Sequence, residues 1–140
     1  MHPFSMLVFD PHPALLRMLV RYLEEQHSGM LIIAGAAFRE ADALVLAMAT
    51  SPEVVLLGMR GPMTHALQLI VALRCLLPTV IIVMMNDLGM AGYAQAALDG
   101  GADTFVDKDH LNADLIPAIL QVARARDSIP AAVLTASDTR

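Results

Sequence analysis

The chain has 140 residues, a length that suits one domain with a single hydrophobic core. Hydrophobic residues make up 56% of it and charged residues only 16%, against roughly 25% in an average soluble domain, so we expect an unusually apolar surface. The formal net charge of −5 argues against direct nucleic-acid binding by this domain, because such binding depends on Lys and Arg side chains facing phosphates.

The apolar runs are short. None reaches the roughly 18 residues that a membrane-spanning helix requires, and no basic region leads into an apolar one at the N-terminus. We therefore expect no membrane span and no signal peptide, and predict a cytoplasmic location. The single cysteine, Cys75, can form neither an intramolecular disulfide nor a multi-cysteine metal site, which agrees with a reducing compartment.

Short apolar runs alternate with longer helical patterns along the whole chain. The runs predict strands at residues 6–10, 30–36, 54–57, 80–85 and 104–107. The helical patterns cover residues 13–26, 39–49, 64–77 and 88–98, and the last one runs from residue 112 or 114 to about residue 126. We expect the helix at 88–98 to be the least stable, because Gly89 and Gly92 each cost about 1 kcal/mol relative to alanine.

The segment from Glu53 to Pro62 is the most informative of these. Its apolar run ends at Gly58, and the turn Gly61-Pro62 follows, with Pro62 four residues after Gly58. This pattern is typical of a strand that is buried on both faces of a parallel sheet and opens into a functional loop.

Five strands alternating with five helices predict a parallel sheet covered on both faces. We expect an α/β fold, a flavodoxin-like doubly wound five-stranded sheet of order 2-1-3-4-5, with its site at the carboxyl ends of the strands. Residues 1–126 are expected to form this domain. Residues 127–140 are rich in Ala, Ser, Thr and Pro, and are interpreted as a linker or tail.

Residues 5–125 resemble the response-regulator receiver domain, the CheY-like domain of two-component signalling. The motifs that carry the resemblance are Asp10-Pro11-His12-Pro13, the runs 53–62 and 80–85, Gly101-Ala102-Asp103, Phe105 and Lys108-Asp109. The His-Pro pair after the first strand and the Lys-Asp pair after the fifth are most similar to receivers that precede a LuxR-type helix-turn-helix domain. The resemblance implies a signalling domain of a transcription regulator, and no enzymatic activity.

Receivers accept a phosphoryl group on an aspartate, and the resemblance implies which positions should serve this chemistry. Asp10 matches the first of two adjacent acids that hold magnesium, but Pro11 stands where the second should be. Gly58 stands at the phosphoacceptor position and Met84 at that of a phosphate-binding hydroxyl. Lys108 alone is retained from the phosphate-binding set. Because glycine offers no nucleophile and methionine no hydroxyl, we predict a degenerate pocket without phosphorylation.

The same replacements predict what fills the pocket. We expect a direct ion pair between Asp10 and Lys108, with flexible methionine side chains filling the remaining gap, namely those of Met59, Met84 and Met85. The resemblance places Phe105 at the position of an aromatic side chain that moves when the hydroxyl engages phosphate. Without that hydroxyl, we expect Phe105 to be fixed by packing in a single state.

Other interpretations of these residues are open. Asp10 and Lys108 could be ordinary surface residues at strand ends, which are common in doubly wound folds. His12 and His65 lie beside the same edge, but no His-x₃-His pair or cysteine ligand accompanies them, so we predict no metal site. No G-x-G-x-x-G or Walker pattern occurs, and the first strand leads into Asp-Pro-His-Pro instead of a flavin phosphate loop, so we predict no cofactor.

Surfaces are therefore expected to carry the function. The third and fourth helices carry apolar residues with few charges between them, and these predict an interface: Leu67, Ile70, Val71, Met90 and Tyr93. We expect a homodimer or a stable complex with a partner regulatory protein.

Three interpretations of the function follow. The first is a phosphorylation-independent pseudo-receiver that acts as a dimerisation and regulatory module, in a transcription regulator. The second is a stand-alone adaptor that binds a histidine kinase or another regulator. The third is a sensor of a small ligand in the altered pocket between Asp10, Gly58, Met84 and Lys108.

Overall fold

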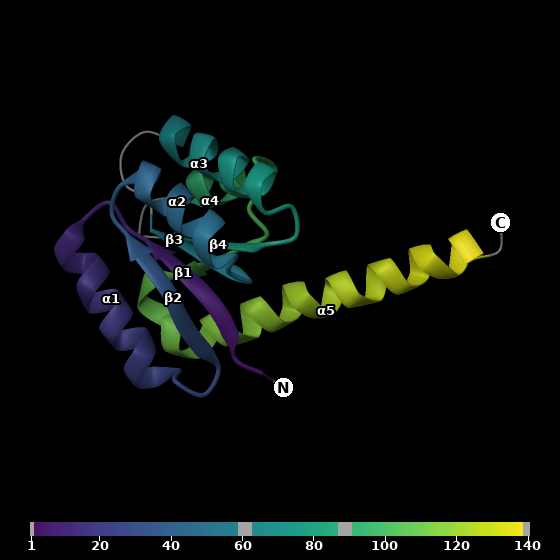
Figure 1. Cartoon of the computed structure of the whole chain (residues 1–140), viewed down its shortest axis with the longest axis horizontal. Helices are drawn as coiled ribbons and strands as arrows, with labels where there is room; N and C mark the ends of the chain where they lie inside the picture. Colours follow the sequence, from purple (N-terminus) through teal and green to yellow (C-terminus); the bar gives the residue numbers. More distant parts are fainter. Residues whose placement is uncertain (1, 59–62, 87–90, 139–140) are drawn as a thin grey trace.

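The computed structural model of the protein describes residues 2–58, 63–86 and 91–138. Five parallel strands form one sheet in the order β2-β1-β3-β4-β5, as predicted (Figure 1). The strands are β1 Phe4–Phe9, β2 Leu31–Ala37, β3 Val54–Gly58, β4 Ile81–Asn86 and β5 Thr104–Asp107. The fold is therefore the expected doubly wound α/β sandwich.

Helices cover both faces of this sheet. They are α1 Pro13–Gln26, α2 Glu40–Thr50, α3 Met63–Leu76, α4 Ala91–Asp99 and α5 Leu111–Asp138, with the short 3-10 helix η1 Lys108–His110 before the last. Helices α2, α3 and α4 pack on one face, and α1 and α5 on the other (Figure 1). None of the described helices combines the length and the apolar character needed to span a bilayer.

The core consists of two clusters, one on each face of the sheet, because successive side chains of a strand point to opposite faces. In β1, Leu7 and Phe9 belong to the cluster under α2 and α3, whereas Met6 and Val8 belong to the cluster under α1 and α5. All five residues of β3 are buried. This confirms that the apolar run ending at Gly58 is a strand buried on both faces.

The boundaries of most elements agree with the predictions to within two residues. The predicted start of the fourth helix, at residue 88, lies outside the described residues. The prediction that the last helix ends near residue 126 is wrong, since α5 continues to Asp138. The Ser and Pro residues of this segment suggested a loop, but its alanines favour a helix.

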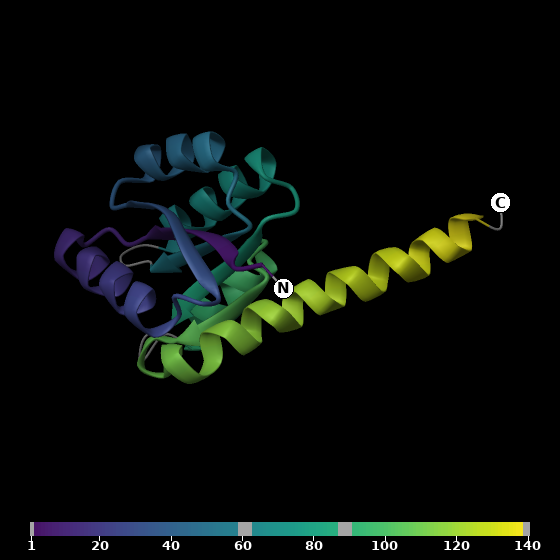
Figure 2. The ribbon, with the colours of Figure 1, turned by 60° about the horizontal axis from the view of Figure 1, so that its bottom comes forward.

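Beyond the sheet, α5 projects away from the body of the domain in both views (Figures 1 and 2). Residues 127–138 belong to this projecting part, so the segment interpreted as a linker or tail is helical over most of its length. The division of the chain into residues 1–126 and 127–140 stays a prediction, because a helix can also serve as a linker.

A cluster of charged side chains joins the elements at the amino ends of β4 and β5. Asp103, just before β5, accepts hydrogen bonds on Oδ2 from Nη2 of Arg74 and from the backbone N–H of Ile82, both at 2.8 Å. Its Oδ1 accepts one from Nη2 of Arg126, also at 2.8 Å. Both guanidinium groups also donate to the carbonyl oxygen of Val80.

This Arg74–Asp103–Arg126 network connects helices from the two sides of the sheet. Arg74 lies near the end of α3 and Arg126 lies in α5, and all three charged side chains are partly buried. Charged hydrogen bonds are stronger than neutral ones, and removing one partner of a buried set leaves the others uncompensated. The network therefore fastens α5 to the edge of the sheet.

Replacing Asp103 with alanine should lower the free energy of unfolding by at least about 2 kcal/mol, because two guanidinium groups and the Ile82 N–H lose their acceptor. Urea denaturation measures this loss. The matched control is Asp99→Ala in α4, where an exposed carboxylate accepts one hydrogen bond from Gln95 and the loss should stay within about 0.5 kcal/mol. Equal losses in the two variants would show that the network adds no stability.

Candidate functional site

The predicted site residues follow or end strands of the sheet. Asp10 comes directly after β1, Gly58 is the last residue of β3, and Lys108 follows β5 as the first residue of η1. Because the strands are parallel, their carboxyl ends meet at one edge. The structure brings these three residues together there, as the sequence predicts.

Asp10 is the charged residue at the centre of this edge. Its exposed fraction is 0%, and its Oδ1 accepts a hydrogen bond of 2.9 Å from the backbone N–H of His12. An aspartate that accepts from the second residue after it closes a local turn, and Pro11 occupies the position between them. One carboxylate oxygen is thus bound to the protein's own loop.

The other oxygen of Asp10 faces Lys108. Nζ of Lys108 lies 4.0 Å from Oδ2, which is within the range of an ion pair but too long for a hydrogen bond. Oδ2 is buried and accepts no hydrogen bond from the described part of the chain. The expected ion pair between Asp10 and Lys108 is confirmed as a charge contact without a direct hydrogen bond.

The space beside Gly58 is filled. A Cβ atom placed on Gly58 would lie 2.5 Å from Cε of Met85 and 2.6 Å from Oδ2 of Asp10, closer than real Cβ contacts come. Gly58 and Met85 are paired across β3 and β4. A methionine therefore fills the gap, as expected, and the position cannot take a side chain unless its neighbours move.

The methionine beside Gly58 is Met85, which corrects the expectation for Met84. Met84 pairs with Leu57 and lies in the core cluster under α2 and α3, whereas Met85 lies in the cluster under α1 and α5. Consecutive strand residues point to opposite faces, so only one of the two can face the site. Met59, the third methionine expected here, lies outside the described residues.

Phe105 lies at the surface of the domain. Its side chain is 42% exposed, and its being held in a single state stays a prediction. It lines a shallow cavity of about 330 Å³ between β5 and α5, together with residues such as Asp114 and Pro117. Phe105 is therefore an exposed aromatic position on the surface next to α5.

The residues of the expected interface lie in different environments. Ile70 is fully buried in the core under α2 and α3, which corrects its assignment to an exposed surface. Val71 is exposed, Leu67 and Tyr93 are half-buried, and Met90 lies outside the described residues. Burial raises the pKa of the Tyr93 hydroxyl above its usual value. An all-apolar helix does not reveal from its sequence which face turns inward.

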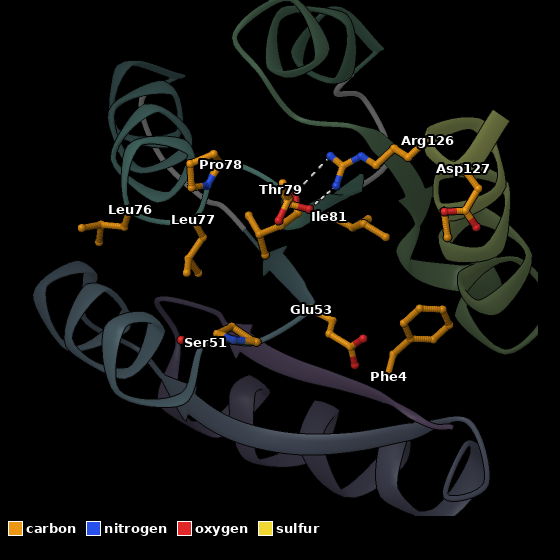
Figure 3. A pocket seen from close by; sticks show the side chains of 13 residues that line it. Phe4, Ser51, Glu53, Leu76, Leu77, Pro78, Thr79, Ile81, Arg126 and Asp127 are labelled. Carbon is orange, nitrogen blue, oxygen red and sulfur yellow. Dashed lines mark hydrogen bonds between the residues drawn. The ribbon is translucent and has the colours of Figure 1, made fainter. Parts of the chain in front are cut away.

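No sequence signal pointed to a cavity of about 450 Å³ at the opposite, amino-terminal edge of the sheet (Figure 3). Arg126 lines it and donates to the carbonyl oxygens of Thr79 and Val80. Burial raises the pKa of Glu53, but hydrogen bonds from His2 and Ser5 outweigh this and hold the pKa below its usual value. The side chains of Arg126 and Glu53 thus form hydrogen bonds within the protein.

His12 and His65 are both exposed. Within residues 2–58, 63–86 and 91–138, no three His, Cys, Asp or Glu side chains are grouped so that they could hold a metal ion.

The sheet order and the residues at its carboxyl edge define a doubly wound α/β domain with a site built by β1, β3 and β5. Residues 6–120 match the family described as the response regulator receiver domain. The chain belongs to this family.

Relatives agree with this assignment. The chain is 34% identical over 125 residues to a probable transcriptional regulatory protein NarL of Mycobacterium tuberculosis, covering 88% of the chain and 56% of that protein. It is 30% identical over 130 residues to a putative transcriptional regulator of Pseudomonas aeruginosa, covering 93% of the chain and 61% of that protein. The chain thus spans less than two thirds of the length of these relatives.

Solved structures show the same fold. The signal receiver domain of the putative response regulator NarL from M. tuberculosis superposes with a TM-score of 0.72 at 30% identity, covering 89% of this chain and 98% of that one. A LuxR-family DNA-binding response regulator from Staphylococcus aureus superposes with a TM-score of 0.70, covering 85% and 98% of the two chains. At 20% identity, the second likeness concerns the fold alone.

Replacing Gly58 with alanine should lower the free energy of unfolding by about 1–3 kcal/mol, because the new methyl group displaces Met85 and Asp10. Thermal or urea denaturation measures the change. Gly92→Ala is the matched control, since a Cβ atom on Gly92 in α4 meets nothing within 4 Å among the residues that the structure describes. The control should be neutral or stabilising by up to about 1 kcal/mol. A neutral Gly58→Ala would show that Met85 and Asp10 move aside without cost.

Proposed function

We propose that this receiver domain acts without phosphorylation, as a dimerisation and regulatory module of a transcription regulator. The observation that carries the proposal is the filled space at Gly58. The methyl group of Met85 and the carboxylate of Asp10 lie where the side chain of a phosphoacceptor would begin. A site of this shape offers no nucleophile at Gly58, and a side chain there would require Met85 and Asp10 to move.

The charges at the site support the same proposal. Receiver chemistry needs acidic residues to hold magnesium. Here Pro11 carries no carboxylate, and Asp10 divides its two oxygens between the His12 N–H and Lys108. The positive charge of Lys108 is thus balanced by a residue of the protein itself. In this proposal the pocket is not phosphorylated, and the domain catalyses no reaction.

The place of the domain in transcription control rests on its relatives. The proteins from M. tuberculosis and P. aeruginosa are both named as transcriptional regulators, and this chain matches little more than half of each. The net charge of −5 favours a protein partner over nucleic acid for the domain itself. A regulator of this kind would work in the cytoplasm.

The adaptor function is the alternative, and the exposed apolar side chains on α2 and α3 favour it as well. The intact mass of the native protein separates the two functions. A mass well above 15.0 kDa, by about the size of a small DNA-binding domain, supports the transcription regulator. A mass of 15.0 kDa supports the adaptor.

The proposal predicts no response to phosphoryl donors. Acetyl phosphate or beryllofluoride with magnesium should leave the amide resonances of Asp10, Gly58 and Lys108 unchanged in two-dimensional NMR spectra, because no acceptor is present. A receiver that carries the acceptor aspartate is the positive control. Shifts clustered at these three residues would overturn the proposal.

A further inference from the structure

Helices α2 and α3 carry large apolar side chains on their outer surfaces. Val45 is 65% exposed and Met48 is 66% exposed, both on α2. Val71 and Leu76 on α3 are exposed as well. With the smaller exposed residues Ala41 and Cys75, these side chains form what we call the α2–α3 patch.

The two helices lie next to each other on the same face of the sheet (Figures 1 and 2). Leu76 of α3 and Ser51, the residue after α2, line the same cavity. On α2, Ala41, Val45 and Met48 are spaced by four and three residues, which places them on one side of the helix. The patch therefore extends over two neighbouring helices.

The acidic residues of α2, Glu40 and Asp42, flank Ala41 at one end of the patch, and no charged residue follows them in this helix. The basic residue of α3, Arg74, is turned away into the network with Asp103. By contrast, the outer surface of α1 carries both acidic and basic residues, namely Arg17, Arg21, Glu24 and Glu25.

The lack of charge favours a second copy of this chain as the occupant. With a net charge of −5, two copies repel each other where their charged surfaces meet, and least where the surface is uncharged. A two-fold dimer places the same patch on both sides of the interface, so the patch must complement itself. An apolar patch does so, whereas a patch of one charge does not. A membrane surface fits less well, because interfacial helices are usually rich in Lys and Arg.

We propose that two copies of this chain associate through their α2–α3 patches around a two-fold axis. This inference rests on the proposed function, in which the domain is a dimerisation module, and it names the surface that dimerises. Of the residues expected from the sequence, only Val71 belongs to this surface. The opposite face of the sheet, with α1 and α5, stays free in the dimer.

The test uses the full 140-residue chain. The substitutions are placed on both helices, because a stable interface buries about 800 Å² on each partner. Sedimentation velocity at roughly 1–100 µM, bracketing the micromolar affinities of weak dimers, should show a dimer of the wild type. Val45→Glu combined with Val71→Glu should raise the dissociation constant by at least about 100-fold, because like charges would then face each other.

Met18→Glu is the matched control. Met18 is a 67% exposed apolar residue on α1, across the sheet from the patch, and its replacement should leave the dimer unchanged. Circular dichroism checks that each variant is folded, and the milder pair Val45→Ala and Val71→Ala should weaken the dimer without adding charge.

The outcomes separate this inference from the proposed function. A wild type that is monomeric at every concentration overturns both the dimerisation module and this surface. A dimer that Val45→Glu with Val71→Glu leaves intact, or that Met18→Glu disrupts equally, overturns the α2–α3 patch alone. A response to beryllofluoride overturns phosphorylation independence and leaves the patch standing if its variants behave as expected.

Discussion

The structure depends on the burial of β3 on both faces. Because all five of its residues are enclosed, its backbone groups must be satisfied by β1 and β4, which run parallel to it. This pairing sets the register of the carboxyl edge and places Gly58 opposite Met85. A shift of one residue would turn Met84 toward the site and remove Met85 from it. The composition of the pocket is thus a consequence of strand register.

The elements could be predicted from the sequence because burial leaves a local signal. Continuous apolar runs and helical patterns predicted the order of strands and helices, and strand ends predicted that Asp10, Gly58 and Lys108 would meet. The register of neighbouring strands leaves no such signal, so the sequence could not show whether Met84 or Met85 lies beside Gly58. The orientation of α3 was equally hidden, since apolar residues surround it and Ile70 and Val71 cannot be distinguished by type. The end of α5 was missed because Ser and Pro outweighed the neighbouring alanines.

The Asp103 network was missed for another reason. Its ion pairs join residues that are 23 and 29 positions apart in the chain, and no periodic pattern connects them. The two edges of the sheet consequently differ in how their charges are used. At the carboxyl edge, Asp10 and Lys108 face each other without a hydrogen bond, in a site filled by methionine. At the amino edge, a carboxylate is fully engaged and holds helices from both layers.

At the amino edge of the sheet, α5 continues well beyond the body of the domain. Residues 127–138 form 12 residues of helix beyond Arg126, which at about 1.5 Å per residue extend the helix by about 18 Å. The hydrogen bonds of Arg126 to Asp103 and Val80 lie where this extension begins. The direction in which residues 127–138 leave the domain is therefore set by a few hydrogen bonds at the edge of the sheet.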